Sequence, residues 1–290
     1  IKFKRFMQTI PQQPDIRPAE LTEQLRKYQS AGKALLATNF YNFETLRGVL
    51  QAASSMESPI ILQLTKSSID YMGLGAAVKM ARAGMQQFNV KGWLHLDHCY
   101  SYSQIQQCLD AGFDSVMIDA SERSLEENIA STRKVVELAM QYNANVEAEL
   151  GYVAKLGQST EQVGFTDPEE ARRFVNETGV HALAVAIGSA HGFYKQEPKL
   201  DIALLAEIRE ATQTPLVLHG GSGIPSESLR AAMAEGICKI NLATEIKNIF
   251  TRTLQTCLTE NSEIDLRIVF PPAIQAVSDL VKEKLVIINR

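Results

Sequence analysis

The sequence predicts a closed (β/α)8 barrel of the TIM-barrel class, because short apolar runs alternate eight times with longer amphipathic runs along 290 residues. The apolar runs have the composition of parallel strands that are buried on both faces. An open, doubly wound sheet would also alternate, but eight units on a chain of this length favour closure. We expect one domain over residues 1–290, with one extra helix before the first strand and another after the last unit.

The predicted strands are 34–38, 59–64, 93–97, 115–119, 146–150, 182–187, 216–219 and 238–242. The predicted helices are 18–30, 43–56, 69–83, 103–111, 124–142, 167–178, 201–211, 225–234, 244–258 and 272–285. Helix starts carry clear signals: TDPEE at 166–170 has a capping residue, a proline at the first helical position and acids in the first turn. The helix at 18–30 is expected to be a lid on the base of the barrel, and an irregular linker is expected before the C-terminal helix.

Composition narrows the class of protein. The net charge is −4 and no basic stripe is found, so nucleic-acid binding is not expected. No apolar run reaches the roughly 18 residues that a membrane span needs, and the first ten residues are too charged for a signal peptide. The four cysteines show no CxxC spacing, which fits a reducing compartment. We therefore expect a cytoplasmic protein without a membrane or nucleic-acid partner.

Three histidines stand at the ends of strand-like runs: WLHLDH ends on His98, LAVAIGSAH on His191 and LVLH on His219. The chemistry of such barrels gathers at the C-terminal ends of the strands, so these imidazoles are expected to converge there. Three protein ligands leave a fourth position of Zn²⁺ open, which is typical of a catalytic site. Co²⁺ would also fit this ligand set.

Acidic residues surround the same strand ends. Asp97 precedes His98 and is expected to orient a ligand or to act as a general acid or base, although it could also cap the next helix. Asp119, Glu147 and Glu149 form a second ring of acids, which could hold an alternative metal position, support the histidines or make structural hydrogen bonds. Of the other two histidines, His95 is expected inside the barrel and His181 at its base.

Two loops follow the last two strands, the glycine-rich HGGSG at 219–223 and NLAT at 241–244. Loops at these positions of a barrel frequently bind phosphate, because glycine backbone N–H groups and a helix N-terminus favour anions. Gly220, Ser222 and Thr244 are the expected contacts, and Gly192 and Lys195 could add to them. A metal beside a phosphate site suggests a phosphorylated carbonyl substrate and cleavage of a neighbouring carbon–carbon bond.

Six motifs carry a resemblance to a known family: HLDH (95–98), SVMIDAS (115–121), VEAELG (146–151), AVAIGSAHGFY (184–194), PLVLHGGSGIP (215–225) and KINLAT (239–244). In this order, over nearly the whole chain, they resemble the class II, metal-dependent fructose/tagatose-bisphosphate aldolases. The NLAT form of the last motif is most similar to the tagatose-bisphosphate branch. The resemblance implies a lyase of carbohydrate metabolism, as in glycolysis, that reversibly cleaves a ketose (bis)phosphate to dihydroxyacetone phosphate and an aldehyde such as glyceraldehyde 3-phosphate.

The resemblance also implies roles for individual residues. His98, His191 and His219 would hold one catalytic Zn²⁺ per subunit, and Asp119 and Glu149 would bind a second or displaced metal. Asp97 would move the proton of the C4 hydroxyl. The residues implied to bind substrate are Asn39, Gln63, Gly192, Lys195, Gly220, Ser222, Asn241 and Thr244. A monovalent cation, Na⁺ or K⁺, and a homodimer or homotetramer are implied as well.

Two stretches depart from the family pattern. The loop 151–164 lacks the paired acids that relatives use to exchange the proton on the dihydroxyacetone carbon, which leaves Glu161 as the candidate catalytic residue, or as an ordinary solvated one. The run 270–276 lacks the arginine that grips a distal phosphate. Arg267 is out of register, and Lys66 or Arg47 could substitute for it. The aldehyde half of the substrate is therefore left open.

Other functions fit parts of the pattern. An aldolase for a related sugar-acid or inositol-derived phosphate would use the same site with a different aldehyde half. A metal-dependent sugar-phosphate epimerase or isomerase would need similar carbonyl chemistry without bond cleavage. A barrel that only binds sugar phosphates would explain the atypical loop, but it would give the full metal set no purpose.

Overall fold

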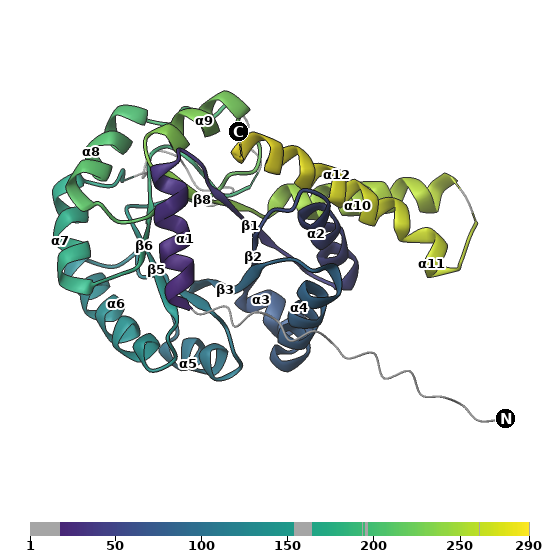
Figure 1. Cartoon of the computed structure of the whole chain (residues 1–290), viewed down its shortest axis with the longest axis horizontal. Helices are drawn as coiled ribbons and strands as arrows, with labels where there is room; N and C mark the ends of the chain where they lie inside the picture. Colours follow the sequence, from purple (N-terminus) through teal and green to yellow (C-terminus); the bar gives the residue numbers. More distant parts are fainter. Residues whose placement is uncertain (1–17, 154–163, 193, 195–196, 261, 290) are drawn as a thin grey trace.

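Eight parallel strands close into a barrel in the order in which they occur along the chain, which confirms the predicted (β/α)8 class (Figure 1). The computed structural model describes residues 18–153, 164–192, 194, 197–260 and 262–289. The strands are β1 (Leu35–Asn39), β2 (Ile60–Thr65), β3 (Gly92–Cys99), β4 (Ser115–Ile118), β5 (Asn145–Leu150), β6 (Ala182–Val185), β7 (Leu216–Leu218) and β8 (Ile237–Leu242).

The helices form a ring outside the barrel, with further helices before the first strand, after β2 and after the last unit (Figure 1). They are α1 (Pro18–Ser30), α2 (Phe43–Ser55), α3 (Lys66–Met72), α4 (Leu74–Phe88), α5 (Tyr102–Asp110), α6 (Leu125–Met140), α7 (Pro168–Thr178), α8 (Ile202–Thr212), α9 (Ser226–Ala234), α10 (Thr244–Glu260), α11 (Leu266–Val269) and α12 (Pro271–Ile288). In Figure 1, α10, α11 and α12 form an arm that extends beyond the ring, with α11 at its far end.

Local sequence signals explain where helices begin and end. Ser124 and Glu127 form a reciprocal capping box at the start of α6. Asp167 accepts hydrogen bonds from two backbone N–H groups of α7, whose first residue is Pro168. Gly179 ends the same helix in the left-handed conformation, at φ 68°. These caps satisfy backbone groups that a helix cannot pair internally.

Alternate residues of each strand enter two different hydrophobic cores. Leu36 and Leu62 face outward and pack against the helices. Leu35 and Ile61, one position earlier, face into the barrel, where Leu21 and Leu25 of α1 join them. The predicted lid at 18–30 is therefore present, and it seals one end of the barrel. The opposite end carries the loops that follow the strands, and it is the only end left for a site.

Some predicted boundaries were wrong. The helix expected at 69–83 is two helices, α3 and α4, because Gly73 adopts φ 82° between them. The irregular linker before the C-terminal helix contains the short helix α11. Strand β6 ends at Val185, so His191 lies in the loop after the strand and not at its tip. Among the described residues, none of the helices combines the length and apolar character that a membrane span requires.

Candidate metal centre and active site

An irregularity in β3 directs two consecutive side chains into the same site. In a regular strand, neighbouring residues point to opposite faces. Here the register between β3 and β4 shifts between Leu96 and Cys99, and His98 takes a left-handed backbone conformation with φ 46°. Asp97 thus faces the barrel interior while His98 turns toward the strand ends. Such a conformation is costly for a non-glycine residue and is typical of functional sites.

The three predicted histidines converge on one point. The Nε2 atom of His98 lies 3.2 Å from Nε2 of His191 and 3.0 Å from Nδ1 of His219. Four-coordinate Zn²⁺ with Zn–N bonds of 2.0–2.1 Å would place its ligand nitrogens about 3.3–3.4 Å apart. The three nitrogens all lie within 4.8 Å of one another. The histidine set is therefore a suitable ligand set for a divalent cation.

Carboxylates contact two of these rings at the nitrogen that faces away from the convergence point. Oδ2 of Asp119 is 2.7 Å from Nδ1 of His98, and Oε1 of Glu147 is 2.9 Å from Nε2 of His219. Oε2 of Glu149 lies 3.2 Å from Nδ1 of His219, on the side of the convergence point. Within the described part of the chain, this oxygen is buried without a hydrogen-bond partner. The orphaned acceptor is a second feature that a cation would satisfy.

The surroundings shift the pKa values of two of the candidate ligand histidines in opposite directions. Burial, followed by the two neighbouring histidines, lowers the pKa of His191 to about 4, so His191 offers a lone pair at neutral pH. Burial also lowers the pKa of His219, but Glu147 and Glu149 outweigh it and raise the value to about 10. A divalent ion must therefore displace a proton from His219, and ion binding releases that proton.

Asp97 is held at the mouth by amides from β1 and β8. Its Oδ2 accepts a hydrogen bond from Asn39 at 3.1 Å, and Asn39 in turn accepts one from Gln63 at 3.1 Å. Its Oδ1 is 3.4 Å from the amide nitrogen of Asn241. Burial raises the pKa of Asp97, but the surrounding cationic groups, with His98 foremost, leave it below its ordinary value. The carboxylate is therefore ionised and ready to accept a proton.

The loops after β6, β7 and β8 meet beside the histidines. Gly220 has φ 68°, and a Cβ at this position would lie 2.2 Å from the carbonyl oxygen of Ala190. Gly221 donates to the carbonyl of Asn241 at 3.0 Å. The hydroxyl of Tyr194 accepts from the Ala190 N–H at 2.8 Å and donates to the Gly220 carbonyl at 2.9 Å. Only glycine permits this close approach, which builds one compact backbone cradle.

A buried ion pair connects this cradle to the C-terminal helix. Glu245, in the first turn of α10, accepts from the Gly223 N–H at 3.0 Å, and its own N–H donates to the Ser222 hydroxyl at 3.3 Å. Lys284 of α12 lies 2.9 Å from Oε2 of Glu245, with only 10% of its side chain exposed. The cradle therefore depends on α12 for its shape and its charge balance.

The structure brings most of the predicted site residues together. The three histidines, Asp97, Asp119 and Glu149 meet at the centre, and Asn39, Gln63 and Asn241 lie beside Asp97. Gly220 and Ser222 lie in the cradle, Thr244 is the first residue of α10, and Gly192 directly follows a metal-candidate histidine. Glu161 and Lys195 fall outside the described residues.

Three cations considered for the distal anion lie elsewhere or have other partners. Lys66 pairs with Asp70 at 2.5 Å, and Arg47 is exposed on α2. Arg267 pairs with Asp265 at 2.7 Å in α11, at the tip of the arm in Figure 1.

The two other predicted histidines lie where structural residues are expected. His95 is buried in the barrel interior, and His181 accepts a hydrogen bond from the Val146 N–H.

Several contributing residues were not predicted from the sequence. Lys239 is inside the barrel, and its place two residues before Asn241 on β8 could have indicated this. Lys247 lies in the first turns of α10, where its ammonium stands 5.5 Å from the ring centre of Tyr41 at the mouth. The pair of Glu245 and Lys284 joins residues 39 apart in the chain and leaves no local sequence signal.

Comparisons with known proteins agree with this geometry. The sequence model of the family described as fructose-bisphosphate aldolase class-II matches residues 19–290. The chain is 40% identical to the D-tagatose-1,6-bisphosphate aldolase subunit GatY of Klebsiella oxytoca over 264 residues, which is 89% of this chain and 93% of that protein. The crystal structure of the YdjI aldolase from Escherichia coli K12 superposes with a TM-score of 0.82 at 31% identity, covering 92% of this chain and 96% of that chain.

A fructose-bisphosphate aldolase from Campylobacter jejuni has the same fold at 20% identity, with a TM-score of 0.81 and 94% and 95% of the two chains covered. At this identity the likeness concerns the fold alone. The family match over nearly the whole chain is more specific: the chain belongs to the class II fructose-bisphosphate aldolase family. It is a lyase that cleaves a carbon–carbon bond of a sugar phosphate.

Proposed function

We propose that this aldolase depends on Zn²⁺ and reversibly cleaves a ketose 1,6-bisphosphate to dihydroxyacetone phosphate and glyceraldehyde 3-phosphate. The observation that carries the proposal is the convergence of the His98, His191 and His219 nitrogens beside an ionised, amide-bound Asp97. The likeness to a tagatose-bisphosphate aldolase subunit favours tagatose 1,6-bisphosphate over its C4 epimer. Asp119 and Glu149 are proposed to hold a second or displaced metal.

In this proposal the chain's own residues position the substrate and move protons. A bound Zn²⁺ would polarise the substrate carbonyl as a Lewis acid. Asp97 takes the proton of the C4 hydroxyl as the C3–C4 bond breaks, which leaves the aldehyde. The electron pair of that bond stays on C3, in the half that carries the C1 phosphate. A proton added at C3 then completes dihydroxyacetone phosphate. Glu161 is the proposed donor of that proton.

The C1 phosphate is proposed to bind in the cradle of Gly192, Gly220, Ser222 and Thr244, with Lys195 and Asn241 beside it. Backbone N–H groups and the N-terminus of α10 provide favourable partial charge for an anion there. Na⁺ or K⁺ is proposed to assist at this phosphate. Asn39 and Gln63 are proposed to orient the substrate near the reacting carbons, because both belong to the amide chain that holds Asp97.

Lys247 is the proposed partner of the distal phosphate. Its side chain is exposed, and its ammonium lies over the ring of Tyr41. The Tyr41 hydroxyl lies 3.5 Å from the Ala243 carbonyl, next to the start of α10. Lys247 thus places a cation at the mouth, whereas the run 270–276 has no arginine.

We also propose that the enzyme is a cytoplasmic homodimer or homotetramer. Four apolar side chains are exposed on the arm: Leu258, Ile264, Leu266 and Ile268, with Ile264 exposed by 89%. Apolar groups gathered in this way are typical of an interface between subunits. All four cysteines are free, as a reducing compartment would keep them. Sedimentation equilibrium would give the subunit number.

The test compares fructose and tagatose 1,6-bisphosphates with their 1-phosphates in a coupled assay for dihydroxyacetone phosphate. We expect chelator-reversible release from a bisphosphate. Lys247→Met should raise KM for the bisphosphate without changing KM for the 1-phosphate, whereas Lys66→Met serves as the matched control and should change neither. Release of no triose phosphate from any substrate, or formation of an epimer alone, would contradict the proposal.

A further inference from the structure

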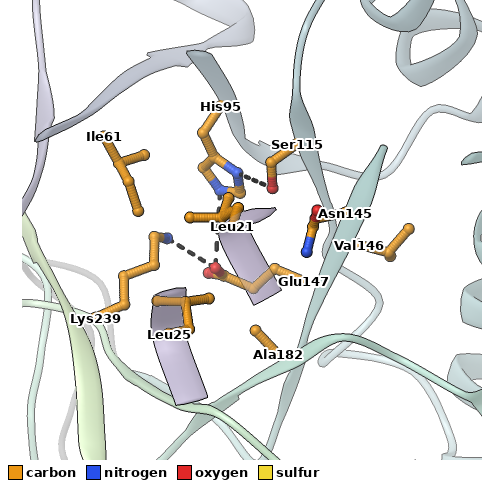
Figure 2. Close-up of a pocket in the computed structure, with 10 residues that line it drawn as sticks. All are labelled: Leu21, Leu25, Ile61, His95, Ser115, Asn145, Val146, Glu147, Ala182 and Lys239. Carbon is orange, nitrogen blue, oxygen red and sulfur yellow. Dashed lines mark hydrogen bonds and ion pairs between the residues drawn. The ribbon is translucent and has the colours of Figure 1, made fainter. Parts of the chain in front are cut away.

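A buried group of charged and polar side chains lies inside the barrel beneath the metal centre, and the proposed mechanism does not use it. Figure 2 shows Lys239 and His95 directed toward Glu147, with Leu21 and Leu25 of α1 beside them. Glu147 and Lys239 are each only 2% exposed. Their charged atoms, Oε2 and Nζ, are 2.7 Å apart. His95 lies 3.9 Å from the same carboxylate oxygen and is tied to Ser115 at 2.8 Å.

The two oxygens of Glu147 have different partners. Oε2 binds the Lys239 ammonium, while Oε1 accepts from Nε2 of His219 at 2.9 Å. Because the carboxylate occupies Nε2, the other ring nitrogen of His219 is the one that faces His98, at 3.0 Å. The opposite holds for His98, which gives Nδ1 to Asp119 and presents Nε2. The acids behind the rings thus select which nitrogen each histidine presents.

A gain in stability does not by itself account for this buried pair. Burying two ions carries a desolvation cost that their attraction often only offsets, and apolar residues of similar volume frequently replace such pairs without loss. Apolar side chains share the cavity with the pair: Ile61, Ala182 and the α1 leucines line it together with His95 and Ser115 (Figure 2). The hydrogen bond between Glu147 and His219 connects the pair to the metal centre. Its benefit is therefore expected at that centre.

We propose that Glu147 and Lys239 are positioning residues that hold His219 with Nδ1 directed at the ion, and that Lys239 acts only through Glu147. This inference rests on the metal centre of the proposed function. Lys239 comes from β8 and Glu147 from β5, so the pair spans the barrel interior. Its ammonium keeps the carboxylate from swinging away from His219, because both side chains are buried and their charged atoms are in direct contact.

The test measures metal binding directly. Zn²⁺ affinity of the apoprotein is determined by competition with a chromophoric chelator, and the visible spectrum of the Co²⁺ form reports ligand geometry. We expect Glu147→Gln and Lys239→Met each to weaken Zn²⁺ binding by about 10–100-fold and to alter the Co²⁺ spectrum. The double variant should bind no more weakly than Glu147→Gln alone, because Lys239 acts through Glu147.

Lys284→Met is the matched control, because Lys284 is also a buried lysine paired with a glutamate, but at the cradle and not at a histidine. It should leave Zn²⁺ affinity and the Co²⁺ spectrum unchanged. Thermal unfolding checks that each variant folds, and Glu147→Gln, which is isosteric, carries the test if Lys239→Met does not fold. If the wild type binds Zn²⁺ and the variants show unchanged affinity and an unchanged Co²⁺ spectrum, the positioning role of Glu147 and Lys239 is overturned, while the proposed metal centre stands. A wild type without Zn²⁺ affinity would overturn the proposed metal centre as well.

Discussion

Replacing Lys284 by methionine should weaken phosphate binding from a distance. Lys284 lies on α12, where it neutralises Glu245, and Glu245 in turn holds the Gly223 N–H and the Ser222 hydroxyl of the cradle. Methionine keeps the length and apolar stem of the side chain but removes the charge. Glu245 would then be an uncompensated carboxylate at the N-terminus of α10, next to the site where an anion is proposed to bind.

The magnitude follows from burial and charge. Full loss of one partner of a deeply buried pair costs about 3–5 kcal/mol. The two side chains here are 10% and 17% exposed, so we expect a somewhat smaller loss of about 1–3 kcal/mol in the free energy of unfolding. One uncompensated charge at about 8–15 Å, with an effective dielectric constant of about 20, acts on each unit of phosphate charge with about 1–2 kcal/mol. This energy corresponds to a rise in KM of about 5–30-fold for each unit of phosphate charge.

Steady-state kinetics with a ketose phosphate, together with urea unfolding and zinc analysis, would measure both effects. Zinc content should stay unchanged, because Lys284 contacts none of the histidines. Adding Glu245→Gln should recover part of the KM, since the repelling charge is then absent. A KM for Lys284→Met equal to that of the wild type in a folded protein would refute the reasoning, and so would a double variant that is no better than the single one.

Three further perturbations test other parts of the site. Asp97→Asn should lower kcat by about 10²–10⁴-fold with zinc content unchanged; a kcat within tenfold of the wild type would show that Asp97 does not move the proton. Gly220→Ala should raise KM for phosphorylated substrates at least tenfold, because the added Cβ would meet the Ala190 carbonyl at 2.2 Å; unchanged kinetics would exclude the cradle as the phosphate site. Burial raises the pKa of Tyr194 to about 12, so the unfolded chain loses this proton at a lower pH than the folded protein does. The contribution of Tyr194 to the free energy of unfolding is therefore complete below about pH 10 and is lost as pH rises toward 12. Urea unfolding of Tyr194→Phe should therefore show a smaller loss between pH 9 and 11 than the wild type does, and an equal loss would contradict the assignment.

The eight-unit barrel and the convergence of the histidines could be predicted because they follow from periodicity and position. Parallel strands end on the same side of the barrel, so the strand ends that carry His98 and His219 lie at the same rim. His191 arrives at the centre in a different way. Its strand ends at Val185, and the loop that follows the strand brings His191 back to the centre.

Other features depend on contacts that no local pattern encodes. The bulge in β3, which lets Asp97 and His98 share one site, is a matter of register with β4. Lys239 and Glu147 are 92 residues apart, and their pairing follows only from closure of the barrel. The break at Gly73 was missed because a periodic apolar pattern continues across it, although the glycine's backbone conformation ends one helix there and begins another.

The most direct test of the account is the metal dependence of bond cleavage in one sample. The protein would be purified, its bound metals quantified, and release of dihydroxyacetone phosphate from tagatose 1,6-bisphosphate followed before chelation, after chelation and after return of Zn²⁺. The account predicts about one zinc ion per subunit, loss of cleavage on chelation and recovery on adding Zn²⁺ or Co²⁺. Cleavage that continues at full rate in metal-free protein would contradict it.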